Sequence, residues 1–208
     1  NNRGANNFWG TYNRVNPDGF KFYRHDAEHT LFNVNESRIG PYPAGEQREQ
    51  FNPQWLHQQL TANAEYRLLF ADRVFRHFFN GGALTEEANI ARLMARKNTI
   101  DNAIITESAR WGDVLRGTPY TRDNEWLDEV ETLINDYFTR RSDIVLRQFI
   151  DAGWYPNFTP PTFNAESGNV DKGFQLTMTA PGKIYYTDDG SDVYGQLSGE
   201  GVQLTTIV

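Results

Sequence analysis

The 208-residue chain contains no cysteine. This absence excludes disulfide bonds, thiolate nucleophiles and zinc sites with cysteine ligands. The chain also lacks any apolar run that approaches the length of a membrane span, so we predict no membrane-spanning segment. Positive charge is in the minority, because the formal net charge at pH 7 is -7. That balance argues against binding to the phosphates of nucleic acids, and we predict no nucleic-acid partner.

The beginning of the chain lacks both an initiator methionine and an apolar leader, since it opens on Asn1, Asn2 and Arg3. We therefore expect the sequence to be a piece of a larger protein. Aromatic residues, by contrast, are abundant at 14%. Such a content predicts a well-packed core and ring-lined surfaces for sugars or protein partners.

The segment from residue 20 to residue 32 carries the densest chemistry in the chain. An aromatic run with the pattern of a short strand follows the turn-forming residues 16–19. Directly after the strand come two imidazoles and two carboxylates within five residues, namely His25, Asp26, Glu28 and His29. A strand that delivers such a cluster into a loop is a common way of building a metal site or an acid-base site.

The middle of the chain has the pattern of helices. Apolar residues recur at three- and four-residue steps between residues 52 and 150, and this spacing predicts five helices. Their expected first or capping residues are Pro53, Asn63, Thr85, Thr121 or Asp123, and Ser142 with Asp143. Residues 1–18 and 33–50 are rich in asparagine or in turn-forming residues, and we predict loops there.

The composition changes after Pro156. Residues 157–170 include Pro160, Pro161 and Gly168, which indicate a linker. Alternating apolar and polar residues then predict strands over 174–179 and 183–187, with a third over 202–208. Because two or three strands are marginally stable alone, we expect an incomplete β-module.

The predicted fold class is therefore α+β. We expect a mainly helical domain with a short strand and loop at its candidate site, followed by an antiparallel β-module that is cut short.

Five segments of the helical part carry recognisable motifs: residues 2–9, 25–29, 51–56, 78–85 and 107–113. In this order they resemble the CotH-like (spore coat protein H-like) atypical kinase family, in the form found within large secreted bacterial proteins. Residues 109–113, Ala-Arg-Trp-Gly-Asp, are the more specific part of this resemblance. Residues 173–192 resemble the small β-sandwich known as the chitobiase/hexosaminidase C-terminal domain.

The kinase resemblance implies an atypical protein-kinase fold, of which this chain would hold the C-terminal helical lobe. In that family a metal-binding Asn lies five residues after a catalytic Asp, and a metal-binding Asp follows a strand. The matching positions here are Asn2 for the catalytic residue, and Asn7 and Asp26 for the metal ligands. Asn7 and Asp26 would hold Mg²⁺ or Mn²⁺ against the phosphates of ATP, because these cations prefer hard oxygen ligands.

The sequence departs from the family pattern at two positions. Asn2 stands where the family has the catalytic Asp, and an amide cannot accept the proton of a substrate hydroxyl. His25 stands where many relatives have Trp.

The proposed site residues also have ordinary structural interpretations. Asp26 could serve as a turn or cap residue, and Asn7 could bond its own backbone in a loop. Glu28 and His29 could orient Asp26 or form a buried pair. His25, Glu28 and His29 also match the H-x-x-E-H pattern of zinc proteases, which requires a helix through all three residues. The aromatic strand just before them argues against such a helix.

We predict three parts: a helical lobe over residues 1–156, a linker over 157–170 and a partial β-sandwich over 171–208. The predicted function is that of a bacterial kinase in the secreted or cell-envelope compartment, which transfers the γ-phosphate of ATP to Ser or Thr of envelope or extracellular proteins. This piece alone would be inactive, because ATP binding needs the N-terminal lobe of the kinase fold. The alternative is a non-catalytic pseudokinase, a surface scaffold or adhesion module that binds protein or glycan through its β-module.

Overall fold

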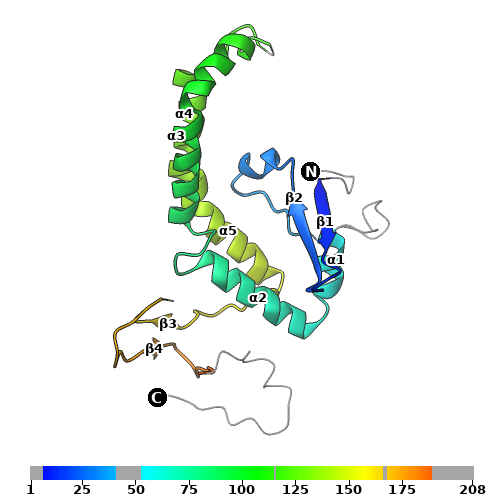
Figure 1. The fold of residues 1–208 in the computed structure, drawn as a ribbon, viewed down its shortest axis with the longest axis vertical. Helices are drawn as coiled ribbons and strands as arrows, with labels where there is room; N and C mark the ends of the chain where they lie inside the picture. Colours follow the sequence, from blue (N-terminus) through cyan, green and yellow to red (C-terminus); the bar gives the residue numbers. More distant parts are fainter. Residues whose placement is uncertain (1–6, 41–52, 115, 166–167, 189–208) are drawn as a thin grey trace. The chain divides into compact units, whose positions relative to one another are not determined.

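The computed structural model describes residues 7–40, 53–114, 116–165 and 168–188, except for the side chains of residues 28 and 29. The chain divides into two compact units, Asn1–Tyr155 and Pro156–Val208. Among the described residues, helices make up most of the first unit, which also holds a β-hairpin, and the second unit holds one pair of short strands (Figure 1). The predicted α+β class is confirmed for the described residues.

The first unit begins with an antiparallel hairpin of β1, Phe8–Tyr12, and β2, Phe20–Arg24. Phe8 lies opposite Arg24, and Tyr12 lies opposite Phe20. The strand predicted after the turn is confirmed, whereas the prediction of a loop over residues 1–18 was wrong for β1. Aromatic residues and Thr11 favour a pleated strand, and the asparagines around them obscured that preference.

Three helices follow the hairpin: α1 at Pro53–Leu60, α2 at Ala64–Phe78 and α3 at Glu86–Trp111. The predicted caps are confirmed, since the Asn63 side chain accepts from the backbone N–H of Tyr66 and Thr85 accepts from that of Ala88. None of the helices in the described ranges is long and apolar enough to cross a bilayer.

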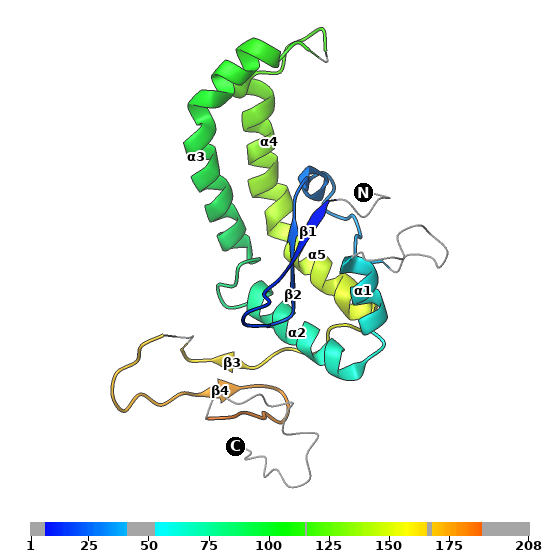
Figure 2. The same cartoon turned by 45° about the vertical axis from the view of Figure 1, so that its right-hand side comes forward.

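The chain then forms a helical segment over residues 122–151 in which π-helical turns interrupt the α-helical geometry. We call this segment the interrupted helix. It comprises η2 at Arg122–Trp126, α4 at Leu127–Thr132, η3 at Leu133–Tyr137 and α5 at Phe138–Asp151. The segments η2 and η3 are single π-helical turns. The interrupted helix returns alongside α3, with α4 beside it (Figure 2).

The prediction of a separate fifth helix capped by Ser142 and Asp143 was wrong. The hydroxyl of Ser142 instead donates to the carbonyl of Leu84, 2.5 Å away, from within α5. No Gly or Pro interrupts residues 122–151, and the inward residues of this segment continue at helical spacing. Side-chain packing therefore extends the helix through a site that sequence alone reads as a start signal.

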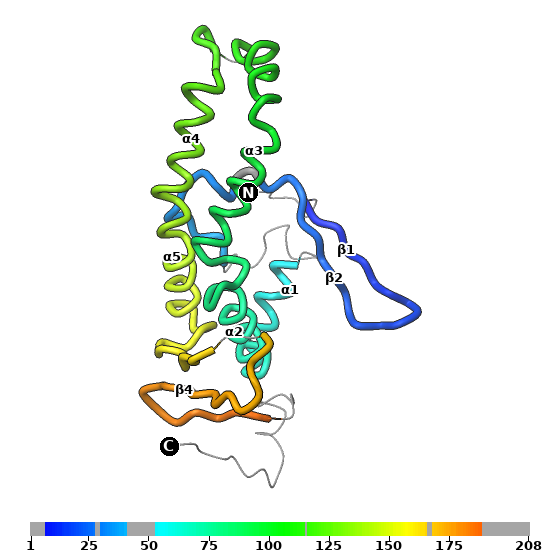
Figure 3. The backbone as a smooth tube through the Cα atoms, turned by 60° about the vertical axis from the view of Figure 1, so that its left-hand side comes forward, coloured from blue at the N-terminus to red at the C-terminus, as the bar shows by residue number. Residues whose placement is uncertain are grey.

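Two clusters of buried side chains hold the first unit together. One consists of Val34, Leu133 and Tyr137, with Leu93 of α3 packed against it. The other consists of Ala71, Val74 and Tyr155, surrounded by phenylalanines of α2 and α5. The first cluster joins the segment after β2 to the interrupted helix, while the hairpin itself projects away from the helices (Figure 3).

The second unit has only a minimal sheet among its described residues. Strand β3, Thr162–Phe163, pairs antiparallel with β4, Met178–Thr179. The Asn164 side chain extends the pairing, because it donates to the Gln175 carbonyl at 2.9 Å and accepts from the Thr177 N–H at 2.7 Å.

The predicted β-sandwich is absent from the described part of the second unit. The strand expected over 174–179 is reduced to β4, residues 183–187 form no strand, and β3 lies inside the predicted linker. The third predicted strand, 202–208, lies outside the described residues. Phe174, Leu176 and Tyr185 are exposed, so alternation here has no second sheet to pack against.

His57 of α1 lies half-buried in an aromatic group of the first unit. Its ring centroid lies 4.6 Å from that of Trp154 and 4.9 Å from that of Phe70. Its Nδ1 lies 2.8 Å from the hydroxyl oxygen of Tyr66. Burial lowers the pKa of His57 below its usual value of 6.5, because the ring loses water that would solvate the charged form.

We predict that His57 makes the free energy of unfolding depend on pH. Because the folded-state pKa is lowered, the unfolded chain takes up the His57 proton first as pH falls below about 6.5, and stability decreases from there until the lower folded pKa is passed. Denaturant unfolding at about pH 7.5 and about pH 5.5 measures this loss, which His57→Gln should reduce. His77→Gln, at an exposed position of α2, is the control and should retain the full loss. Equal pH dependence in the two variants would contradict the account.

Candidate functional site

The structure brings Asn7 and Asp26 into direct contact. The side-chain Nδ2 of Asn7 donates to Oδ2 of Asp26 at 2.8 Å and to the Asp26 carbonyl at 3.3 Å. The strand register explains this, because Asn7 immediately precedes β1 and Asp26 closely follows β2 at the same end of the hairpin. A backbone bond from the His25 N–H to the Asn7 carbonyl, at 3.3 Å, extends the pairing beyond the strands.

Asp26 has an unusual backbone conformation. Its φ is +52°, in the left-handed region that residues with a Cβ rarely occupy. Aspartate tolerates this region better than most residues, but the conformation still costs free energy unless neighbouring contacts hold it. The two bonds from Asn7 supply such contacts and hold the carboxylate beside the Asn7 amide.

The Asn7–Asp26 pair fits a hard divalent cation by its donor atoms. The Asp26 carboxylate and the amide oxygen of Asn7 are the ligand types that Mg²⁺ and Mn²⁺ prefer. In the structure Asn7 presents its NH₂ to Asp26, so its amide must turn over to place the oxygen on a shared cation. Among the described side chains, no group of three His, Cys, Asp or Glu could hold a metal. The remaining ligands would be water and phosphate oxygens, which is usual for Mg²⁺.

The other predicted site residues are only partly described. Asn2 lies outside the described residues, as do the side chains of Glu28 and His29. The backbone of residues 28 and 29 belongs to η1, Glu28–Leu31, a short 3-10 turn. The described His25 does not join this turn, and its ring centroid lies 5.9 Å from that of Trp9. The helix that the zinc-protease pattern requires through residues 25–29 is therefore not formed.

Three side chains of the interrupted helix hold the segment that follows Asp26, and the sequence interpretation missed this role. Tyr137 donates its hydroxyl to the Thr30 carbonyl. Arg141 donates to the carbonyls of Val34 and Glu36 at 2.6 Å and 2.8 Å. Burial raises the pKa of Tyr137, so its hydroxyl keeps the donated proton at neutral pH.

Gln148 is the third of these side chains. It lies 3.5 Å from two carbonyls of the same segment, those of residues 35 and 36. The sequence holds one signal of this role. Arg141 and Gln148 occupy inward positions of an otherwise apolar helical stripe, which indicates polar contacts with another segment.

A separate ionic group joins α3 to the beginning of the interrupted helix. Arg122 lies 2.7 Å from Asp101 and 2.5 Å from Asp123, and Lys97 lies 3.6 Å from Asp101. The hydrogen bond from Arg122 holds the pKa of Asp101 below its usual value. The Arg122–Asp101 pair joins η2 to α3, which pack against each other, so we interpret this group as a structural contact.

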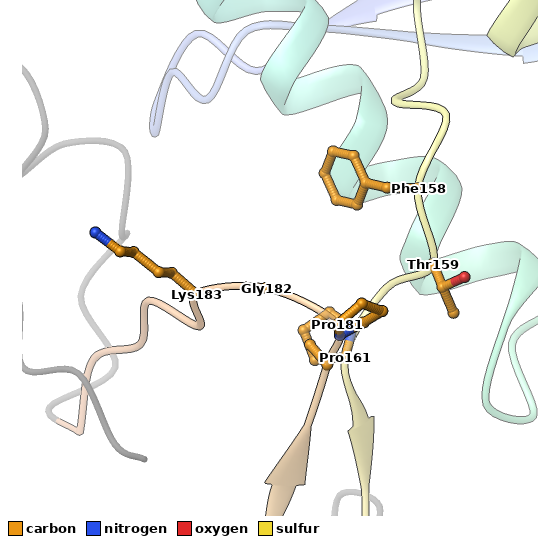
Figure 4. A pocket seen from close by; sticks show the side chains of 7 residues that line it. Phe158, Thr159, Pro161, Pro181, Gly182 and Lys183 are labelled. Carbon is orange, nitrogen blue, oxygen red and sulfur yellow. The ribbon is translucent and has the colours of Figure 1, made fainter.

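A hollow of about 310 Å³ lies within the second unit. Phe158, Pro161 and Pro181 supply apolar walls, and Lys183 is the one charged residue of the lining (Figure 4). Figure 4 shows the Lys183 side chain directed away from the Phe158 ring. The lining contains no pair of groups suited to acid-base chemistry.

No family model, no curated protein and no solved structure matches the chain. The resemblance to CotH-like kinases therefore stays a prediction based on the motifs.

We predict that Asp26→Gly gives a more stable protein than Asp26→Ala, by about 1 kcal/mol. Both variants lose the bond from Asn7 to the carboxylate, but only Gly occupies a φ of +52° without strain. Chemical denaturation of the two variants measures the difference. The backbone of the neighbouring His25 lies outside the left-handed region, so His25→Ala should be more stable than His25→Gly. The same order at both positions would show that Asp26 does not have this conformation.

Proposed function

We propose that this chain supplies the cation-binding loop of a CotH-like atypical protein kinase. The parent enzyme would transfer the γ-phosphate of ATP to Ser or Thr of envelope or extracellular proteins of a bacterium. The observation that supports the proposal is the contact between Asn7 and Asp26, the two positions that the family resemblance assigns to the metal. Residues nineteen positions apart meet, and both side chains carry oxygen atoms of the kind that hold Mg²⁺ in phosphoryl-transfer sites.

The roles of the residues follow from their chemistry. A bound Mg²⁺ or Mn²⁺ would neutralise charge on the phosphates of ATP. Asp26 would supply an anionic oxygen, and Asn7 would supply a neutral oxygen and keep the Asp26 carboxylate in place. Asn2 offers no group that accepts a proton, so the proposal assigns cation binding to this chain, with no turnover by itself. ATP would be bound largely by a nucleotide-binding lobe outside these residues.

The test is the affinity of the chain for Mn²⁺, followed through the electron paramagnetic resonance signal of the free ion. Asp26→Asn keeps the size and the backbone tolerance of the side chain but removes its charge. We expect it to weaken Mn²⁺ binding at least about tenfold. Asn7→Ala should weaken binding as well, because it removes the second oxygen.

Asp18→Asn is the matched control for the charge. Asp18 is an exposed carboxylate near the turn of the same hairpin, 2.5 Å from Lys21. Its replacement should leave Mn²⁺ affinity unchanged. Equal Mn²⁺ affinity in the wild type, the Asp26 variant and the Asp18 variant would refute the proposed cation site.

A second candidate function, a non-catalytic scaffold or adhesion module, is favoured by the exposed rings of the hairpin. The exposed Phe20 and Phe22 and the half-buried Phe8 form a ladder on one face, with ring centroids 6.0 Å and 6.4 Å apart along it. Trp9 and Tyr23 lie opposite each other on the other face. A two-stranded sheet that exposes rings on both faces is marginal alone and suits contact with a protein or a glycan.

We predict that, if the chain is such a module for glycans, binding depends on the hairpin. Phe20→Ala and Phe158→Ala form a matched pair, because these rings are 68% and 70% exposed but belong to the two different units. Binding of the chain to an oligosaccharide array should be lost with Phe20→Ala and retained with Phe158→Ala. Loss only with Phe158→Ala would move the binding surface to the second unit, and no binding by the wild type would reject a glycan-binding module.

A further inference from the structure

We propose that Tyr137 and Arg141 are positioning residues for Asp26. They hold the backbone of residues 30–36, which we call the anchored loop, and thereby set the cation affinity of the Asn7–Asp26 pair. This inference rests on the cation site proposed above.

The first step of the argument is the short connection between Asp26 and Tyr137. Thr30 closes the turn after Asp26, because its N–H and its hydroxyl both donate to the Ala27 carbonyl, at 3.0 Å and 2.7 Å. The carbonyl of the same Thr30 accepts the hydroxyl of Tyr137. A single hydrogen-bonded turn therefore joins the backbone next to Asp26 to a buried side chain of η3.

The second step is the other end of the anchored loop. The Nη1 of Arg141 donates to two carbonyls, those of Val34 and Glu36. Val34 lies in the sequence between Thr30 and Glu36. Its side chain is only 8% exposed and packs with Leu133 and Tyr137. The loop is thus fixed by polar contacts on both sides of one buried apolar side chain, and all of them come from consecutive turns of the interrupted helix.

The third step is the need for such an anchor. The hairpin that carries Asn7 is largely exposed, and Asp26 has a strained backbone. A strained residue keeps its conformation only where its surroundings fix it. If the anchored loop loosens, the backbone of Asp26 relaxes and the fraction of molecules with a competent site decreases. Apparent affinity then decreases in proportion to that fraction.

Two arginines next to each other in α5 provide a comparison within the chain. Arg141 is half-buried and reaches the anchored loop, whereas Arg140 is exposed and pairs with Asp136 one turn earlier, at 2.6 Å. Arg140→Gln and Arg141→Gln remove the same charge from the same helix. Only the second should affect the Asp26 loop.

The experiment measures Mn²⁺ affinity and backbone amide NMR spectra of the full chain for Tyr137→Phe, Arg141→Gln and Arg140→Gln. We expect Tyr137→Phe to weaken Mn²⁺ binding about fivefold, the factor that corresponds to one lost hydrogen bond of ordinary net strength. Arg141→Gln should weaken it at least as much, because Arg141 donates to two carbonyls. In both variants the Asp26 and Ala27 amide signals should shift without added metal. Arg140→Gln should change neither quantity, and Arg141→Lys, which keeps a charged donor, should restore part of the affinity.

Val74→Ala is the control that separates a positioning role from a general loss of stability. Val74 is 4% exposed in the other buried cluster, so this variant lowers stability without touching the anchored loop. If it weakens Mn²⁺ binding as much as Arg141→Gln does at the same temperature, the positioning role is refuted.

Failure of the cation site and failure of the positioning role give different results. A wild type that binds no Mn²⁺ rejects the cation site, and the metal-free amide shifts of Asp26 and Ala27 still decide the positioning role. If those shifts are the same in Arg141→Gln and Arg140→Gln, the positioning role is overturned.

Discussion

The burial of Val34 against Leu133 and Tyr137 is the contact on which the arrangement of the first unit depends. Removing a valine side chain from water contributes about 1.5–3 kcal/mol. Tyr137 and Arg141 add polar contacts on both sides of it, so backbone carbonyls that lose water find partners on the interrupted helix. These apolar and polar contacts join the segment after β2, and with it the site, to the interrupted helix.

The hairpin brings the two site residues together but leaves aromatic residues exposed. Its register brings Asn7 to Asp26 from nineteen residues away, which no local spacing rule provides. It does so with aromatic residues that remain exposed, such as Trp9 and Phe20. Exposed aromatic surfaces are costly unless something covers them. The hairpin whose ends bring Asn7 and Asp26 together is therefore also the most evident contact surface among the described residues.

The sequence predicted the elements whose signals are local. The aromatic strand before His25 and the caps at Asn63 and Thr85 depend on neighbouring residues, and all three are confirmed. Strand β1 was missed because its asparagine-rich flanks look like loop, and pairing with β2 decides the outcome. The end of the fourth helix was misplaced at Ser142, because packing of the stripe around Tyr137 overrides a cap signal. The β-sandwich was expected from a resemblance over residues 173–192 and from alternation, and alternation cannot show whether a second sheet is available to cover the first one.

Asn7 and Asp26 were named from the resemblance, but their mutual contact and the anchored loop follow only from the three-dimensional register. The most direct test of the account is the NMR signal of the Asn7 side-chain NH₂ during a Mg²⁺ titration. If the pair shares a cation, the amide must turn over, so this signal should shift together with the Asp26 amide while that of the exposed Asn80 stays in place. Unchanged Asn7 and Asp26 signals at millimolar Mg²⁺ would contradict the account.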